Sequence, residues 1–127
     1  MQELAATAAG FPLRLRWLRM GDDLCLTLSG GEQDHIGAVA VAQPRPSLAD
    51  PARTSATASV IALPGHKEDM LARELALKVA AILNVAVCVA CGIHVPHPTP
   101  AMLDELVAAS HSLIDAFLAE MQNAAAC

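Results

Sequence analysis

The chain has 127 residues, 54% of them hydrophobic, and a formal net charge of −5. This length allows one domain with a single core. The eight Lys and Arg residues are scattered, so the composition offers no electrostatic footprint for nucleic acid. No apolar run reaches the roughly 18–20 residues that span a bilayer, and residues 1–10 lack the basic region of a secretory signal. We therefore expect a cytoplasmic protein that binds neither nucleic acid nor membrane.

The first half of the chain predicts three strands. Residues 1–11 are alanine-rich and are expected to form a flexible N-terminus. Residues 13–20 alternate apolar and polar side chains, and a short polar turn separates them from the apolar run 24–28, which predicts an antiparallel pair. Residues 36–42 are apolar at every position, as in a strand covered on both faces. Residues 43–55 contain three prolines and predict a long functional loop.

The second half predicts a β-α-β unit followed by a helix. Residues 56–63 resume the strand pattern, residues 67–83 carry apolar side chains at helical spacing, and residues 85–91 are short and rich in β-branched residues. The two strands should be parallel. The last helix should begin at Pro100 with Thr99 as its N-cap. The expected fold is α+β in two layers: a mixed five-stranded sheet in the order β-β-β-β-α-β-α, with both helices packed on it.

Three histidines stand where strands meet loops. His66 and His94 follow the two parallel strands, and His35 precedes the strand at 36–42. If that strand runs antiparallel to its successor, all three side chains meet at one edge of the sheet, whereas Arg45 falls at the opposite end. We expect function at the histidine edge.

Three neutral imidazoles can bind a divalent transition metal and leave one position open. We therefore keep His35, His66 and His94 as a possible metal set, beside the simpler interpretation that they are polar residues at strand ends. The spacing Cys88-x2-Cys91-x2-His94 suggests zinc, but strand alternation sends the two cysteines to opposite faces. Reduced thiols in or beside buried strands are the better interpretation.

The segment Pro64-Gly65-His66-Lys67 leaves a strand and opens a helix. Such a turn directs free backbone N–H groups and the positive end of the helix dipole at the sheet edge. Lys67 adds positive charge, which favours a phosphate or a carboxylate. Glu68 and Asp69 also suit the first helical turn.

Only three residues of the chain are aromatic, namely Phe11, Trp17 and Phe117. The core must therefore be built from Ala, Val, Leu and Ile, which fill little volume per residue. Such a domain commonly buries further apolar surface against copies of itself, so we expect a homo-oligomer.

Four short motifs in order resemble the LpdD-like family of prenylated-flavin chaperones, over about residues 12–120. The motifs are Asp34-His35-Ile36-Gly37-Ala38, Arg45-Pro46-Ser47, Gly65-His66-Lys67-Glu68-Asp69 and Gly92-Ile93-His94. These proteins are accessories of UbiD-type decarboxylases, which use prenylated FMN. The resemblance implies a carrier that binds prenylated FMN, delivers it to an apo-decarboxylase and has a possible part in its oxidative maturation. It implies no decarboxylase activity of the chain itself.

The resemblance also implies a set of cofactor-binding positions, and Arg45 in this set could serve the site of a neighbouring subunit. The positions are His35, Arg45, Ser47, Gly65, His66, Lys67, Glu68 and His94. Two alternatives stay open. One is a small metal-dependent enzyme with the three histidines as ligands and Glu68 or Asp34 as general base. The other is a structural subunit of a decarboxylase complex, with no ligand of its own.

Overall fold

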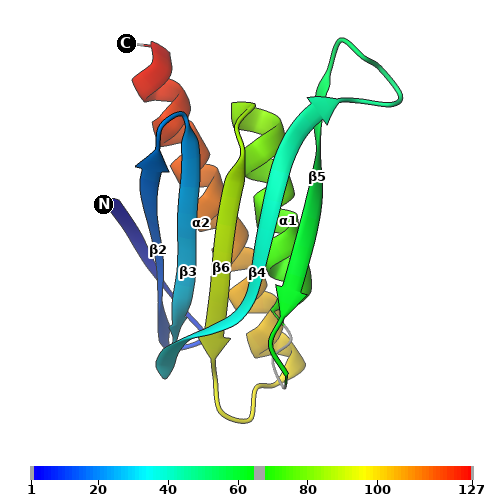
Figure 1. Ribbon diagram of the computed structural model, residues 1–127. Helices are drawn as coiled ribbons and strands as arrows, with labels where there is room; N and C mark the ends of the chain where they lie inside the picture. Colours follow the sequence, from blue (N-terminus) through cyan, green and yellow to red (C-terminus); the bar gives the residue numbers. More distant parts are fainter. Residues whose placement is uncertain (1, 65–67, 127) are drawn as a thin grey trace.

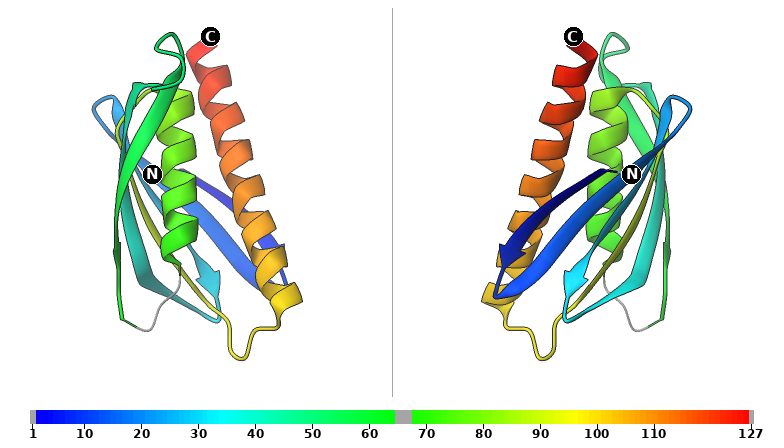
Figure 2. Two further views of the ribbon diagram at one scale, coloured as in Figure 1. Left: turned by 90° about the vertical axis from the view of Figure 1, so that its right-hand side faces the viewer. Right: turned by 90° about the vertical axis from the view of Figure 1, so that its left-hand side faces the viewer.

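The structure is a computed structural model, and it describes residues 2–64 and 68–126. One mixed six-stranded sheet carries two helices on a single face (Figures 1 and 2). The elements along the chain are β1 (Gln2–Ala8), β2 (Phe11–Met20), β3 (Asp23–Gly31), β4 (Gln33–Pro46), β5 (Thr54–Ala62), α1 (Asp69–Leu83), β6 (Val87–His94) and α2 (Pro100–Ala126). The expected α+β class and both helices are thus present.

The sheet has one strand more than the sequence predicted. Residues 2–8, within the expected flexible N-terminus, form β1 and pair antiparallel with β2. A tight turn at Ala9 and Gly10, both with positive φ, joins the two strands. Local periodicity is weak in this alanine-rich stretch, so its strand conformation depends on the ladder that β2 offers. The five-stranded prediction was wrong for this reason.

The strand order across the sheet is β1-β2-β3-β6-β4-β5. β6 pairs parallel with β3 and antiparallel with β4, and β4 pairs antiparallel with β5. β5 and β6 are therefore parallel, as the predicted β-α-β unit requires, with β4 lying between them. The expected antiparallel direction of the strand at 36–42 is also present, because it belongs to β4.

The predicted loop at 43–55 is shorter in the structure. β4 continues to Pro46 and β5 begins at Thr54, so the connection spans only residues 47–53. Beyond Ala42, β4 pairs with β5 alone, because β6 begins opposite this residue. A proline there can turn its missing N–H toward the unpaired side, which is where strands tolerate proline.

The core lies between the sheet and the helices. β3, β4 and β6 turn alternate side chains toward the helices, including Leu26, Ala40 and Val89, which are fully buried. The rings of Trp17 on β2 and Phe117 on α2 meet edge to face with centroids 4.9 Å apart. Two of the three aromatic side chains are therefore used to hold the long second helix on the sheet.

Only one face of the sheet is covered, contrary to the expectation for residues 36–42. Ala38, Ala40 and Ala42 are buried beneath the helices, whereas the side chain of Val41 is 54% exposed on the opposite face. None of the helices in the described part of the chain is long and apolar enough to cross a membrane.

Candidate functional site

The site begins with an irregularity in the pairing of β4 and β6. Asp34 pairs with Ile93 and Ala38 pairs with Cys91, so three residues of β4 bulge opposite Gly92 alone. The backbone carbonyl of His35 lies so close above Gly92 that a Cβ atom there would collide with it. Bulges re-aim side chains at the ends of strands. Here the bulge turns His35 toward the helices, which places it at the end of the sheet where β6 finishes.

His94 is fixed at the last position of β6. Its carbonyl accepts a hydrogen bond of 2.7 Å from the backbone N–H of Glu32, and Gln33 pairs with it on β4. The rings of His35 and His94 lie 6.2 Å apart, centroid to centroid, at an interplanar angle of 83°. The structure therefore brings together these two of the three histidines expected at one sheet edge. His66 lies outside the described residues.

Glu68 is the third polar group of the site. It occupies the N-cap position of α1, but its side chain makes no capping hydrogen bond. Instead, Glu68 Oε1 accepts a 3.2 Å hydrogen bond from the backbone N–H of Ile93 and lies 3.2 Å from His35 Nε2. The other oxygen, Oε2, is buried and accepts no hydrogen bond from the described residues. A buried carboxylate oxygen is stabilised by a donor, so this atom is a natural contact for a ligand N–H or O–H group.

Gly37 makes room for this carboxylate. A Cβ atom at Gly37 would collide with Glu68 Oε2, and the backbone N–H of Leu63 donates to the Gly37 carbonyl at 2.9 Å. Gly37 and Gly92 therefore both serve the site by the absence of a side chain. In the sequence, both glycines stand out only as parts of short motifs.

The three polar groups lie at one end of a cavity of about 490 Å³. The other walls are aliphatic and come from α1, the end of β6, the loop after it and the first turns of α2. The lining residues are His35, Glu68, Leu71, Ile93, His94, Val95, Pro98, Leu103, Leu106 and Val107. Leu103 and Val107 are 48% and 41% exposed, so the cavity is open on the side of α2.

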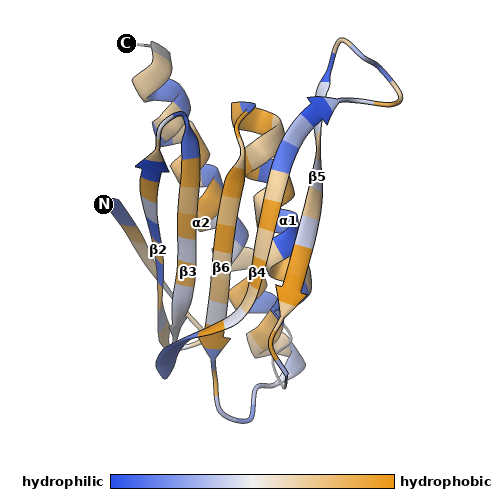
Figure 3. Ribbon diagram, in the orientation of Figure 1, coloured by the Kyte–Doolittle hydropathy of each residue, from blue (hydrophilic) through white to orange (hydrophobic). Residues whose placement is uncertain are grey.

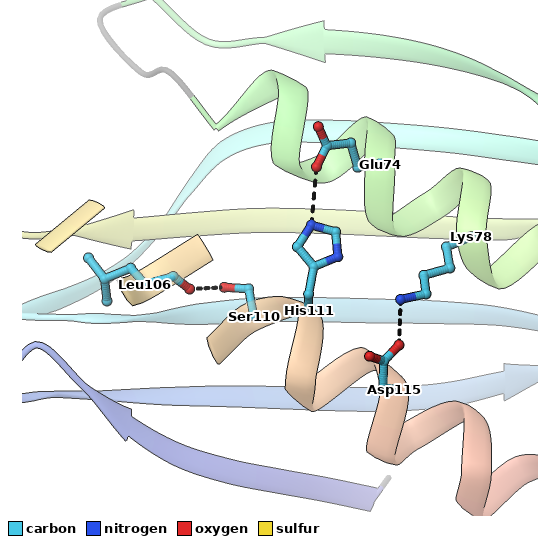
Figure 4. A network of polar contacts seen from close by, with 6 residues as sticks. All are labelled: Glu74, Lys78, Leu106, Ser110, His111 and Asp115. Atoms are coloured by element: carbon cyan, nitrogen blue, oxygen red, sulfur yellow. Dashed lines mark hydrogen bonds and ion pairs between the residues drawn. The ribbon is translucent and has the colours of Figure 1, made fainter. Parts of the chain in front are cut away.

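The two helices run parallel, and both N-termini lie at the cavity end of the sheet (Figure 1). His111 Nε2 lies 3.1 Å from Glu74 Oε2, and Lys78 forms an ion pair with Asp115 one turn further along both helices (Figure 4). These pairs hold α1 and α2 side by side. Two positive dipole ends therefore face the same region, which favours an anion there.

A buried thiol lies close to the carboxylate. Cys91 on β6 is fully buried, and its pKa is raised to about 12 by burial and, secondly, by the negative charge of Glu68. Cys88 lies on the opposite face, where burial and the neighbouring Cys25 raise the pKa of its thiol. The two cysteines of the zinc-like spacing thus point apart, as strand alternation predicts.

The described residues do not support a metal site. No group of three His, Cys, Asp or Glu side chains among residues 2–64 and 68–126 is arranged to hold a metal ion. The set His35, His66 and His94 would need His66, which is not described. Instead, His35 lies beside Glu68, and both His35 and His94 line the cavity.

Two of the expected cofactor-binding residues lie elsewhere. Arg45 is at the far end of β4, roughly 30 Å from His35 by the rise of a strand, and it donates to Thr57 Oγ1 at 2.8 Å. Ser47 Oγ accepts hydrogen bonds from two backbone N–H groups of its own loop. The other expected positions, Gly65, His66 and Lys67, are outside the described residues. One chain therefore does not assemble the whole expected set.

The aliphatic walls were missed in the sequence. Leu71, Leu103, Leu106 and Val107 have helical spacing, which by itself indicates only the apolar face of a helix. These residues lie in the first turns of α1 and α2, and each of these helices follows the end of a strand. At such a position an apolar residue can line a cavity at the edge of the sheet, and this was the signal available in the sequence.

The sequence of the chain matches a known family. Residues 7–122 match the family model described as the prenylated flavin chaperone LpdD-like domain. No curated protein matches the chain. Since the match covers most of the 127 residues, the chain belongs to the LpdD-like family of prenylated flavin chaperones.

Proposed function

We propose that this LpdD-like chain binds prenylated FMN in the cavity between α1, α2 and the end of β6, and delivers it to a UbiD-type decarboxylase. The observation that carries the proposal is a single cavity with aliphatic walls and a polar end made by His35, Glu68 and His94. The chain is proposed to act in the cytoplasm and to have no decarboxylase activity of its own.

The cavity fits the chemistry of this cofactor. Its volume of about 490 Å³ lies in the range of sites for cofactors and small ligands. Prenylated FMN carries an added aliphatic ring, which suits walls of Leu and Val side chains. The flavin also has a polar edge with N–H and carbonyl groups, for which Glu68, His35 and His94 offer an acceptor and possible donors.

The electrostatic field at the same end of the molecule suits the phosphate of the cofactor. Both helix N-termini face this region, and Lys67 directly precedes Glu68 in the sequence. Arg45 and Ser47 lie too far away to join them within one chain. If Arg45 contacts the cofactor at all, it does so from a neighbouring subunit.

The carrier role needs release as well as binding. Leu103 and Val107 are partly exposed, so the cavity opens to solvent along α2 and gives the cofactor a way out. The cofactor, once transferred, supplies the decarboxylation chemistry in the acceptor enzyme. The chain itself needs only to bind, orient and shield it. Help in oxidative maturation is part of the proposal, because an oriented flavin in a half-open cavity stays accessible to an oxidant.

Binding is tested by adding prenylated FMN to the purified chain and measuring the flavin absorbance retained after desalting. His35→Ala and His94→Ala should each weaken binding about tenfold or more, with unchanged circular dichroism, because edge residues contribute little to the core. His111→Ala is the matched control, since His111 contacts Glu74 and does not line the cavity. Equal binding by all three variants would contradict the proposed cavity.

Delivery is tested with an apo-decarboxylase of the UbiD type at limiting prenylated FMN. The enzyme should regain more activity with the chain present than with the cofactor alone, and the His35→Ala variant should lose this advantage. Equal activation with and without the chain would exclude delivery. A chain that co-purifies with the decarboxylase but retains no flavin would instead favour the role of a structural subunit.

A further inference from the structure

The helices leave one face of the sheet open. Helices α1 and α2 lie on one side only (Figure 2). On the other side, the strand register places uncharged side chains in two adjacent rows, each of which crosses four strands. We call these eight residues the open-face patch: Leu18, Cys25, Cys88 and Val41 in one row, and Thr27, Ala90, Val39 and Ile61 in the next.

The open-face patch is unusual for a surface in contact with water. Sheets with one solvated face normally alternate hydrophobic inward and polar outward residues. β6 and the middle of β4 do not alternate, and apolar colour runs along both strands in Figure 3. Val41 is 54% and Ile61 72% exposed in the single chain. The sequence of these strands is that of strands covered on both faces.

Charges on the open face lie beside the patch; Arg14 and Arg16 have carboxylate partners within the chain, whereas Arg45 donates to neutral oxygen atoms. Arg16 contacts Glu3 at 2.7 Å, and Arg14 lies 3.7 Å from Asp34. At the opposite end, Arg45 donates to Thr57 Oγ1 and to the carbonyl of Pro46. Two such faces can approach each other with the charges of Arg14 and Arg16 neutralised and with Arg45 outside the open-face patch, at the end of β4.

The size of the face also matches an interface. Six strands about 4.8 Å apart and about nine residues long cover about 29 by 30 Å, or some 850 Å² per copy. A stable interface of standard size buries about 800 Å² per partner. Small side chains such as Ala90 and Thr27 allow a second sheet to approach closely, at the spacing of about 10 Å typical of packed sheets.

We propose that the open-face patch packs against the same face of a second copy of this chain, so that the protein is a homo-oligomer with its sheets inside and its helices outside. The interface is independent of cofactor binding, because the cavity lies on the helical side of the sheet. Each copy keeps its cavity accessible from the outer surface, between α1 and α2.

The mass of the assembly tests the proposal. Light scattering after size exclusion, at about 50 μM chain, should show an oligomer. Val41→Lys should convert it into a monomer, because a charge at the centre of a dry interface lacks a partner. Ala116→Lys adds the same charge at an exposed position of α2 and should leave the oligomer intact. A monomeric wild type, or an oligomer of unchanged mass in the folded Val41→Lys variant, would overturn the proposal.

The thiols of Cys25 and Cys88 lie inside the patch, so their alkylation rates show whether the patch is covered in the oligomer. In a Cys127→Ser background, alkylation of Cys25 and Cys88 should be slow in the concentrated oligomer and at least about fivefold faster after dilution to monomer. If scattering shows an oligomer but both rates are independent of concentration, another surface forms the contact. If the thiols become protected only when an apo-decarboxylase is added, the face binds that enzyme and not a second copy.

Discussion

His35 Nε2 lies 3.2 Å from Glu68 Oε1, although His35 belongs to a bulge in β4 and Glu68 is the N-cap residue of α1. The same carboxylate oxygen accepts the backbone N–H of Ile93 on β6. One side chain thus joins two strands and a helix at the polar end of the cavity. This junction makes the site sensitive to substitution at Glu68 and at Gly37, which borders its carboxylate.

Glu68→Gln should weaken the binding of prenylated FMN while the chain keeps its fold. The amide retains an acceptor for the N–H of Ile93, but it removes the negative charge beside His35. Hydrogen bonds to charged groups contribute about 1.5–3 kcal/mol, so the dissociation constant should rise about 10-fold to 100-fold. Fluorescence titration with prenylated FMN measures the change. Glu120→Gln, at an exposed position near the far end of α2, is the matched control and should bind like the wild type.

Gly37→Ala should destabilise the fold by about 1–3 kcal/mol, because its Cβ atom would push the Glu68 carboxylate aside and break the hydrogen bond that Glu68 Oε1 accepts from the Ile93 N–H. The collision disappears when Glu68 is removed. The same substitution in a Glu68→Ala background should therefore cost at least about 1 kcal/mol less. Urea denaturation of the two single variants and the double variant gives this coupling energy. A cost that is equal in both backgrounds would mean that the glycine does not serve the carboxylate.

Thr99→Ala should lower the stability by about 1 kcal/mol. Thr99 Oγ1 accepts the backbone N–H of Met102 at 3.1 Å and so caps α2 as the sequence predicted. Thermal unfolding followed by circular dichroism measures the loss. Ser112→Ala in the exposed middle of the same helix should stabilise the chain slightly, because alanine has the higher helix propensity. Equal effects of the two substitutions would argue against a cap at Thr99.

Stability should fall as the pH rises from about 9 toward 12. The pKa of the Cys91 thiol is about 12 in the folded chain and near 9 when it is unfolded, so the unfolded state loses its proton first. Between these values the folded state holds more protons, and the free energy of unfolding therefore decreases with pH. Cys91→Ala should reduce this slope, as measured by urea denaturation at pH 8 to 10.5. Val89→Ala is the control, because it removes buried atoms from the same strand without removing a titrating group, and it should keep the slope of the wild type.

Phe117→Ala should cost about 3–5 kcal/mol, because Phe117 is fully buried against Trp17. Urea unfolding followed by the fluorescence of Trp17, the single tryptophan, measures both the loss of stability and the altered surroundings of the indole. The milder Phe117→Leu should cost less and keep α2 docked. If Phe117→Ala costs under about 1 kcal/mol, the attachment of α2 does not depend on this contact.

The sequence alone predicted the elements whose signals are local. The helix at α1 followed from its apolar spacing, and the start of α2 followed from Thr99 and Pro100. The parallel β5-α1-β6 unit followed from its order along the chain. The first strand could not be predicted, because Gln2–Ala8 has little pattern of its own and becomes a strand only against β2.

The sequence also predicted part of the site. His35 and His94 were expected at one edge of the sheet, because strand direction alone sets which end a residue occupies. The role of Glu68 was only half predicted. Its position at the helix start suggested capping, whereas its side chain instead reaches the backbone of β6. The choice between a local and a distant partner is made by packing.

What the sequence determined by itself is the strands and helices other than β1 and the end of the sheet at which polar residues gather, since these depend on periodicity, caps and chain direction. What only the tertiary structure decided is how β4 bulges over Gly92, how Gly37 admits a carboxylate and how two parallel helices leave an aliphatic cavity beside it. These features depend on contacts between residues far apart in the chain. No local sequence pattern predicts such contacts, because each depends on the space left between side chains that come from distant parts of the chain.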